Sequence, residues 1–137
     1  MSDMHDFNRK VIDEFRQRGG KVSGAFEGAP MILVTHTGAK SGKSYTNPLV
    51  YTRDGDSYVI IASKAGAPED PQWFRNIVAH PEVTVEIGDE TFAARARVAA
   101  GDERARLYRA QAELMPGFDE YAQKTTREIP VVVLDRI

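Results

Sequence analysis

The hydrophobic and polar positions of this chain first follow the period of a helix. Apolar residues recur at the spacing of one helix face near its start, at Phe7, Val11, Ile12 and Phe15. Gly19-Gly20 ends this pattern, because glycine favours the backbone angles found just beyond a helix C-terminus. An amphipathic helix is therefore predicted within residues 1–20, with its apolar face packed on the rest of the domain. Peripheral membrane contact through this helix is the second interpretation.

After residue 30 the pattern changes to short apolar runs and to alternation with a period of two, which is typical of β-strands. Strands are predicted over residues 31–35, 45–52, 57–64, 83–87, 91–99 and 129–134. The turn Arg53–Asp56 contains Asp-Gly, a strong hairpin signal, so the second and third strands are expected to pair antiparallel. A helix is predicted over 71–79 with Asp70 as its N-cap. A longer helix is predicted over 102–115, and one more turn over 118–123.

These elements indicate an α+β fold of about six mostly antiparallel strands with three or so flanking helices. A small barrel or curled sheet is the natural arrangement, because closure removes exposed sheet edges. The length of 137 residues suits a single domain, and no repeat or domain boundary is visible. No apolar run reaches the roughly 20 residues of a membrane span, and the charged start is unlike a secretory signal.

Composition excludes several kinds of site. The chain has no cysteine, which excludes disulfides and cysteine nucleophiles and fits a reducing cytoplasm. Its net charge of −2 argues against a dedicated nucleic-acid binder. His5, His36 and His80 lack the spacing of metal ligands, so no metal site is expected, and no nucleophile elbow or carboxylate pair stands out. An enzyme of this composition is expected to take its chemistry from a cofactor.

One segment has the composition of an anion site. Thr35 to Ser44 is a polar loop between the first two predicted strands, rich in small residues that let the backbone approach a ligand. It lies within residues 28–53, which contain Lys40, Lys43 and Arg53 but no Asp or Glu. The loop almost matches a P-loop, but its spacing is one residue short and a strand pattern follows instead of a helix. An anionic cofactor is the hypothesis, and a surface hairpin that binds nothing is the alternative.

Several spaced motifs follow one another through the chain after residue 30. Thr35-His-Thr-Gly-Ala-Lys-Ser-Gly-Lys43 and then Thr46-Asn-Pro-Leu49 resemble T-T-G-x-K-S-G … T-x-P-L. Ala62-Ser-Lys-Ala-Gly66 resembles A-S-x-G-G, and Asp70-Pro-Gln-Trp-Phe-Arg-Asn-Ile77 resembles H-P-x-W-x-x-N-L. His80-Pro-Glu-Val83 and Arg127-Glu-Ile-Pro-Val-Val132 resemble N-P-x-V and R-x-I-P-V-V. In their order and types these motifs resemble the deazaflavin-dependent nitroreductase family.

The resemblance implies a flavin-reductase-like split β-barrel over residues 1–137 that binds coenzyme F420, an 8-hydroxy-5-deazaflavin with a phosphate and a polyglutamate tail. By matched positions, the phosphate and tail would be held by Ala39, Lys40 and Ser41. The ring and side chain would be lined from two strands, by Tyr45, Thr46, Asn47, Pro48, Leu49 and Val50 and by Ile61, Ala62, Ser63 and Lys64. A helix would complete the pocket with Gln72, Trp73, Phe74, Arg75 and Asn76.

The acceptor side differs from the family pattern. Positions that carry tyrosines in nitroimidazole-reducing members are Met115, Phe118 and Tyr121 here, so only Tyr121 offers a phenol. Ser63 and Tyr121 are the predicted catalytic residues, and Tyr45 stands where the family often has arginine.

The function implied is an F420H2-dependent oxidoreductase that passes a hydride to a quinone-like, nitro or other electron-poor small molecule. An FMN-binding oxidoreductase on the same kind of barrel and a non-catalytic deazaflavin carrier are the alternatives. A monomer or homodimer in the cytoplasm is expected, with attachment to the inner face of the membrane as an open alternative.

Overall fold

The computed structural model describes residues 3–21, 30–63 and 70–137, the first five of them by backbone alone. Lys64 and the predicted loop after it lie outside this part of the chain. The strands are β1 (Met31–Thr37), β2 (Ser44–Val50), β3 (Thr52–Asp54), β4 (Ser57–Ile61), β5 (Glu82–Ile87), β6 (Glu90–Val98) and β7 (Val131–Arg136). The helices are α1 (Asp3–Gln17), α2 (Gln72–Ala79), α3 (Gly101–Leu114) and α4 (Gly117–Lys124).

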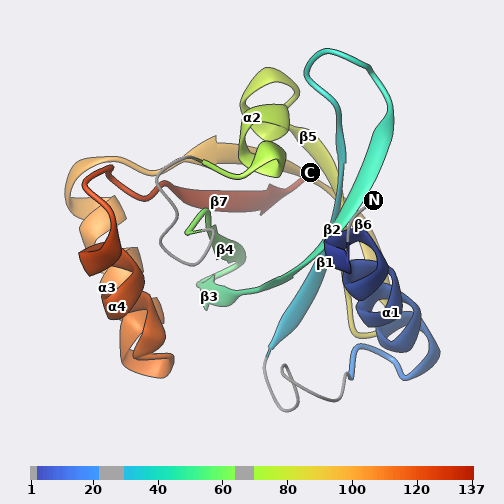
Figure 1. The fold of residues 1–137 in the computed structure, drawn as a ribbon, viewed down its shortest axis with the longest axis horizontal. Helices are drawn as coiled ribbons and strands as arrows, with labels where there is room; N and C mark the ends of the chain where they lie inside the picture. Colours follow the sequence, from blue (N-terminus) through green and yellow to red (C-terminus); the bar gives the residue numbers. More distant parts are fainter. Residues whose placement is uncertain (1–2, 22–29, 64–69) are drawn as a thin grey trace.

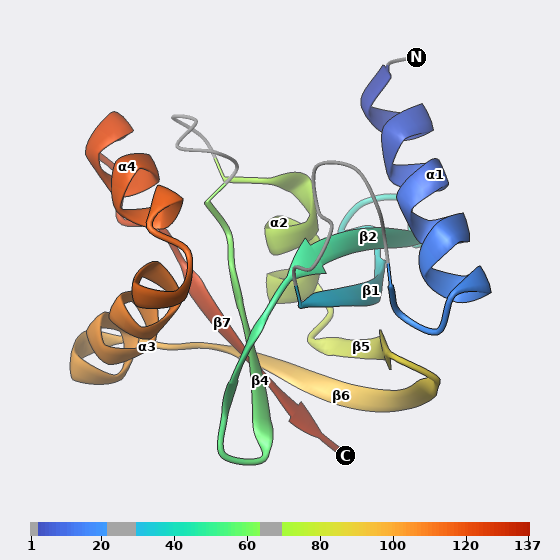
Figure 2. The same cartoon turned by 90° about the horizontal axis from the view of Figure 1, so that it is seen from below.

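The strands form one antiparallel sheet in the order β2-β1-β5-β6-β7-β4-β3, and that order requires the sheet to curl. In a flat sheet the two outer strands would lie roughly 29 Å apart, at about 4.8 Å per strand. Only Tyr51 separates β2 from β3, and a two-residue step spans about 7 Å at most. The two edges therefore meet at Tyr51, and the sheet closes into the half-barrel visible in Figures 1 and 2.

The concave side of the sheet holds the main core. Alternating residues of the strands point inward, and α2 covers one end of the curled sheet (Figure 1). The fully buried members from the strands include Ile32, Val34, Ile60, Val85 and Leu134, and α2 adds Trp73 and Ile77. Each such aliphatic side chain contributes about 1.5–3 kcal/mol by leaving water, so this layer holds the strands in register.

Helix α1 covers the outer face of the β1–β2 hairpin. Val11 and Phe15 are buried against Met31 and Leu33 of β1, which confirms the predicted packing of this helix on the domain. These described apolar residues of α1 face the sheet, so the membrane interpretation finds no support here. No helix among the described residues has the length and apolar character needed to cross a membrane.

Helices α3 and α4 cover a second outer patch, on the side of the sheet away from α1 (Figure 2). Leu107 and Tyr108 of α3 pack with Val59, Ile61 and neighbouring β7 residues, and Phe118 and Tyr121 of α4 lie at the margin of the same cluster. The Tyr108 hydroxyl donates to the Phe118 carbonyl and ties the two helices together.

Most predicted elements are confirmed, and the differences have local causes. The hairpin at Arg53–Asp56 is present, with Gly55 at φ 61°. The single strand predicted over 45–52 is wrong, because the chain changes sheet edge at Tyr51 and continues as β3. Asp70 does not cap α2: Pro71 is the N-cap without a side-chain bond, and Asp70 pairs with Arg127 at 2.8 Å.

Candidate cofactor site

The tip of the β1–β2 hairpin is a tight polar turn formed by residues 38–43. The N–H of Gly42 donates to the Gly38 carbonyl at 3.1 Å, and the N–H of Gly38 donates to the Lys43 carbonyl at 2.8 Å. The N–H of Lys43 donates to Ser41 Oγ at 3.2 Å. In the part of the chain that the structure describes, no acceptor faces the N–H groups of Lys40 and Ser41. The turn thus presents two consecutive backbone donors on exposed residues.

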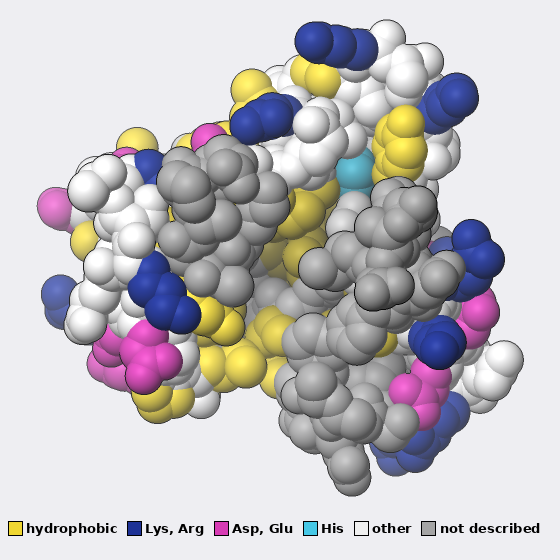
Figure 3. Space-filling view, in the orientation of Figure 1, with side chains coloured by type: hydrophobic (Ala, Val, Ile, Leu, Met, Phe, Trp, Pro, Cys, Tyr) yellow, Lys and Arg dark blue, Asp and Glu magenta, His cyan; other side chains and the backbone are white. Residues whose placement is uncertain are grey.

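Positive charge surrounds this turn. Lys40 and Lys43 are exposed, as is Arg75 on α2, and none of the three forms an ion pair within the described residues. Figure 3 shows Lys and Arg side chains around the hairpin tip and α2, above a group of hydrophobic side chains in the middle of the same face. Arg53, the third cation of the acid-free segment, is elsewhere, 4.7 Å from the centre of the Tyr58 ring.

Beneath the turn, a buried polar network joins three elements. His36 Nε2 lies 2.7 Å from Asn47 Oδ1 on β2, and His36 Nδ1 lies 3.1 Å from Asn76 Nδ2 on α2. Asn76 Oδ1 accepts from the Ala39 N–H at 3.0 Å and from Gln72 Nε2 at 3.1 Å. Helix α2 is therefore bonded directly to Ala39, the second residue of the turn.

The surroundings of His36 disfavour the charged form of its ring. Only 3% of the side chain is exposed, and burial lowers its pKa from the usual 6.5, although the bond to Asn47 acts in the opposite direction. This burial makes His36 a structural residue rather than a solvent-accessible base.

Tyr45 joins the turn to the network. Its ring stacks on His36 with centroids 6.1 Å apart, and its hydroxyl lies 3.2 Å from Ser41 Oγ. A side chain at Gly38 would disturb the same packing, because a Cβ there would lie 2.5 Å from Ser41 Oγ and 2.9 Å from Tyr45 Cε2 and would displace these two side chains. The residue that replaces the family's usual arginine thus supports the turn from below.

Strand β2 divides its predicted contacts between two faces. On the inner face, Tyr45 and Asn47 lie on the side of His36, and Leu49 packs on the core. On the outer face, Thr46 bonds Thr35 at 2.8 Å and Val50 packs near α1. Pro48 is partly buried between them. Side chains from residues 45–50 therefore cannot all line one pocket.

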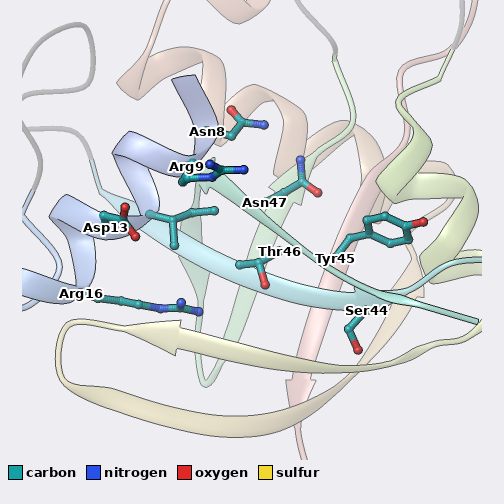
Figure 4. A pocket seen from close by; sticks show the side chains of 9 residues that line it. Asn8, Arg9, Asp13, Arg16, Ser44, Tyr45, Thr46 and Asn47 are labelled. Carbon is teal, nitrogen blue, oxygen red and sulfur yellow. The ribbon is translucent and has the colours of Figure 1, made fainter. Parts of the chain in front are cut away.

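A cavity of about 410 Å³ lies where α1 passes over β2. Asn8, Arg9, Ile12, Asp13 and Arg16 of α1 face Ser44, Tyr45, Thr46 and Asn47 across it (Figure 4). Arg16 is bound to Glu86 at 2.8 Å, whereas Arg9 has no ion pair among the described residues. The sequence analysis missed Arg9, because nothing in the local pattern places α1 beside β2.

The predicted ring-side residues are mostly buried. Trp73 and Ala62 belong to the inner core, and Phe74 packs beside them with its ring centroid 6.4 Å from that of Trp73. Ile61 points to the other side and joins the cluster that includes Phe118 and Tyr121. The structure thus brings Ile61 together with the predicted acceptor residues but places Trp73 in the core.

Arg127 belongs to a matched motif but had no predicted role, and in the structure it connects two segments of the site. Its guanidinium donates to the carbonyls of Ala62 at 3.2 Å and Ser63 at 2.8 Å, and to Asp70 at 2.8 Å. These partners stand on either side of residues 64–69 in the sequence. Arg127 therefore fixes Ser63 and the start of α2 relative to each other.

The predicted acceptor residues lie on and just before α4. Met115, Phe118 and Tyr121 are partly exposed, and the Phe118 and Tyr121 rings meet edge to face at 5.2 Å between centroids. Lys124 lies 6.0 Å from the Tyr121 ring centre. The described residues hold no group of three His, Asp or Glu side chains arranged as metal ligands.

Comparison with known proteins gives a consistent result. The sequence profile of the family described as F420H(2)-dependent quinone reductase matches residues 7–136. An F420H(2)-dependent quinone reductase of Mycobacterium tuberculosis is 40% identical over 126 residues, covering 89% of this chain and 85% of the relative.

Two solved structures share the fold. One, described as an F420-H2 dependent reductase (FDR-A), is 39% identical with a TM-score of 0.72, over 77% of this chain and 94% of its own. Another, described as a domain-swapped dimer, is 33% identical with a TM-score of 0.74, over 97% of this chain and all (100%) of its own. The curled sheet therefore corresponds to the expected split barrel, and this chain belongs to the F420H(2)-dependent quinone reductase family of oxidoreductases.

Proposed function

We propose that this chain binds reduced F420 at the turn 38–43 and uses it to reduce a quinone. The observation that carries the proposal is that the N–H groups of Lys40 and Ser41 and the side chains of Lys40 and Lys43 have no partner in the described part of the chain. A phosphate or carboxylate there would accept charge-assisted hydrogen bonds, which are roughly twice as strong as neutral ones.

The turn by itself suits any phosphate, so the choice between cofactors rests on the family. The names of the matched relatives specify F420H(2), and the FMN alternative finds no support among them. A non-catalytic deazaflavin carrier would use the same turn, and an assay of F420H2 oxidation distinguishes it from a reductase.

The proposed reaction site lies between the end of β4 and α4. Ile61 and Phe118 supply an apolar wall, and the Tyr121 phenol supplies a hydrogen-bond donor at the margin of that wall. Reduced F420, when bound, supplies two electrons as a hydride. The chain then has to place the acceptor, exclude water and donate to the negative charge that develops on the acceptor oxygen, tasks we assign to this wall, Ser63 and Tyr121.

The other predicted contacts keep their place in the proposal with two refinements. The Ala39 N–H and the Asn76 amide are bonded to each other, so we assign both to support of the turn rather than to contact with the ligand. From β2 we assign the face that carries Tyr45 and Asn47 to the cofactor, because it adjoins the turn. Arg75 adds a cation beside it.

Parallel fluorescence titrations with F420 and FMN test the binding. Trp73, the chain's only tryptophan, reports quenching, and steady-state assays with menadione then test turnover. We expect tight binding of F420, weak binding of FMN and oxidation of F420H2 by menadione. Preferential binding of FMN would overturn the assignment of F420 as the cofactor. Binding of F420H2 that no acceptor oxidises would favour the non-catalytic carrier.

A small-molecule acceptor in the cytoplasm is the proposed setting. Because a 33% identical structure is described as a domain-swapped dimer, we include a homodimer beside the monomer in this proposal. Light scattering at assay concentration distinguishes the two.

A further inference from the structure

We propose that His36 and Asn76 are positioning residues that lock the turn 38–43 onto helix α2, so that the N–H groups of Lys40 and Ser41 stay available to an anion. The inference rests on the proposed function, because it names how the cofactor turn is held. It assigns no contact between either side chain and the ligand.

The hydrogen bonds of Asn76 fix the proton on His36. Asn76 Oδ1 faces two donors, the Ala39 N–H at 3.0 Å and Gln72 Nε2 at 3.1 Å, so the acceptor end of the amide is identified. Its Nδ2 therefore donates to His36 Nδ1 at 3.1 Å, and Nδ1 carries no hydrogen. The hydrogen must be on Nε2, where it is donated to Asn47 Oδ1 at 2.7 Å. One tautomer satisfies every bond.

Burial makes this arrangement costly to break. His36 is 3% and Asn76 2% exposed, so water cannot replace a lost partner without opening the structure. An unpaired buried polar group is disfavoured far more than a typical hydrogen bond is favoured. Asn76 bonds both His36 and the N–H of Ala39, which directly precedes Lys40. A change at His36 is therefore transmitted to the turn.

A protonated His36 is incompatible with the pair. An imidazolium would point an N–H at the Asn76 Nδ2 donor, and one bond would be lost. The charged residues of the neighbouring turn and helix are cations: the turn carries Lys40 and Lys43, and α2 carries Arg75. β2 contributes only Tyr45, and β5 turns Glu82 and Glu86 to the outer face of the sheet, opposite the buried Val83 and Val85. Among the residues that the structure describes, no carboxylate therefore faces His36 to stabilise the charged ring.

Nitrogen-15 NMR of the whole chain without cofactor tests the proton assignment. At pH 7.5 we expect a protonated Nε2 and a bare Nδ1 on His36, with exposed His80 as the internal control. In Asn76→Asp the new carboxylate can only accept, so Nδ1 must become a donor and the pKa of His36 should rise. A bare Nε2 in the wild type, or an unchanged His36 titration in Asn76→Asp, would overturn the assignment.

Asn76→Ala tests the link to the turn. We expect hydrogen exchange of the Ala39 amide to quicken at least about 10-fold and F420 to bind about 10- to 100-fold more weakly. With cofactor saturating, the KM for menadione should stay within about twofold. His80→Ala, at the C-terminal end of the same helix, is the control and should change neither quantity.

A purely structural pair would lower the melting temperature of Asn76→Ala but leave Ala39 exchange and F420 affinity at wild-type values, and that result would overturn the proposal. If Asn76→Ala does not fold, the Asn76→Asp titration decides. Failure of the wild type to bind F420 would overturn the proposed function. The nitrogen-15 shifts of His36 and the hydrogen exchange of the Ala39 amide would still test the link between His36, Asn76 and the turn.

Discussion

At the tip of the hairpin, Lys40 has a backbone N–H and an ammonium group that both lack a partner among the described residues. One charge-assisted contact is worth about 1.5–3 kcal/mol, so Lys40→Ala should weaken F420 binding roughly 10- to 150-fold at low salt and less at high salt. Fluorescence titration measures the change, with Lys10→Ala on α1 as the matched loss of an exposed lysine. Equal affinities for Lys40→Ala and the wild type would remove Lys40 from the site.

Gln111 is the one buried residue of the described chain whose side-chain nitrogen and oxygen both lack a partner. It is 2% exposed on α3, so its amide has lost water without gaining a bond. Gln111→Leu should leave the free energy of unfolding unchanged or raise it by about 1–3 kcal/mol, because an apolar group of similar size removes that penalty. Denaturant unfolding measures it, with exposed Gln123→Leu as the control expected within about 0.5 kcal/mol of the wild type. A fall of more than about 0.5 kcal/mol in the free energy of unfolding of Gln111→Leu would show that the amide has a hydrogen-bond partner in solution.

Among the elements, α4 is the one to which we assign the choice of acceptor in the proposed site. Phe118 and Met115 present apolar surface, which favours a flat quinone at roughly 25 cal/mol per Å² buried, whereas a nitroimidazole needs polar contacts that they do not supply. The native protein should therefore reduce menadione faster than a bicyclic nitroimidazole, and Phe118→Tyr should raise the nitroimidazole rate more than the menadione rate.

Tyr121→Phe is the companion variant on the same helix. It should lower turnover with little change in F420 affinity, as measured by titration beside steady-state kinetics. A native nitroimidazole rate above the menadione rate, or wild-type turnover in Tyr121→Phe, would contradict the role given to α4.

At the scale of the whole molecule, His36 links folding to pH. Its pKa in the folded chain is lower than the usual 6.5, so the unfolded chain binds the proton more readily. The stability it contributes is complete above about pH 6.5 and is lost as the pH falls from there through the lower folded pKa. The free energy of unfolding should therefore decline on acidification through this range in the wild type and decline less in His36→Gln. Denaturant melts between pH 7.5 and 5 measure this slope, and a slope unchanged by His36→Gln but reduced by His80→Gln would refute it.

The sequence by itself determined the local features and the family. Helical and alternating periods located three of the helices, one turn of α4 and most strands, Asp54-Gly55 located the β3–β4 hairpin, and the absence of acids marked the turn around Lys40. These features depend on residues only a few positions apart, because their spacing decides which side chains share one face of a helix or strand. The motif order was sufficient to indicate the deazaflavin-dependent reductases, because several spaced signatures rarely coincide by chance.

Only the tertiary structure decided which distant residues meet. His36 bonds Asn76 across 40 positions, Arg127 bonds Ser63 across 64, and neither spacing leaves a periodic trace. The division of the predicted strand at Tyr51 likewise follows from the curl of the sheet, since Val50 and Thr52 on either side of that residue both favour strands. Contacts of this kind are set by which sheet edge a strand joins, and that choice is made by packing of the whole core.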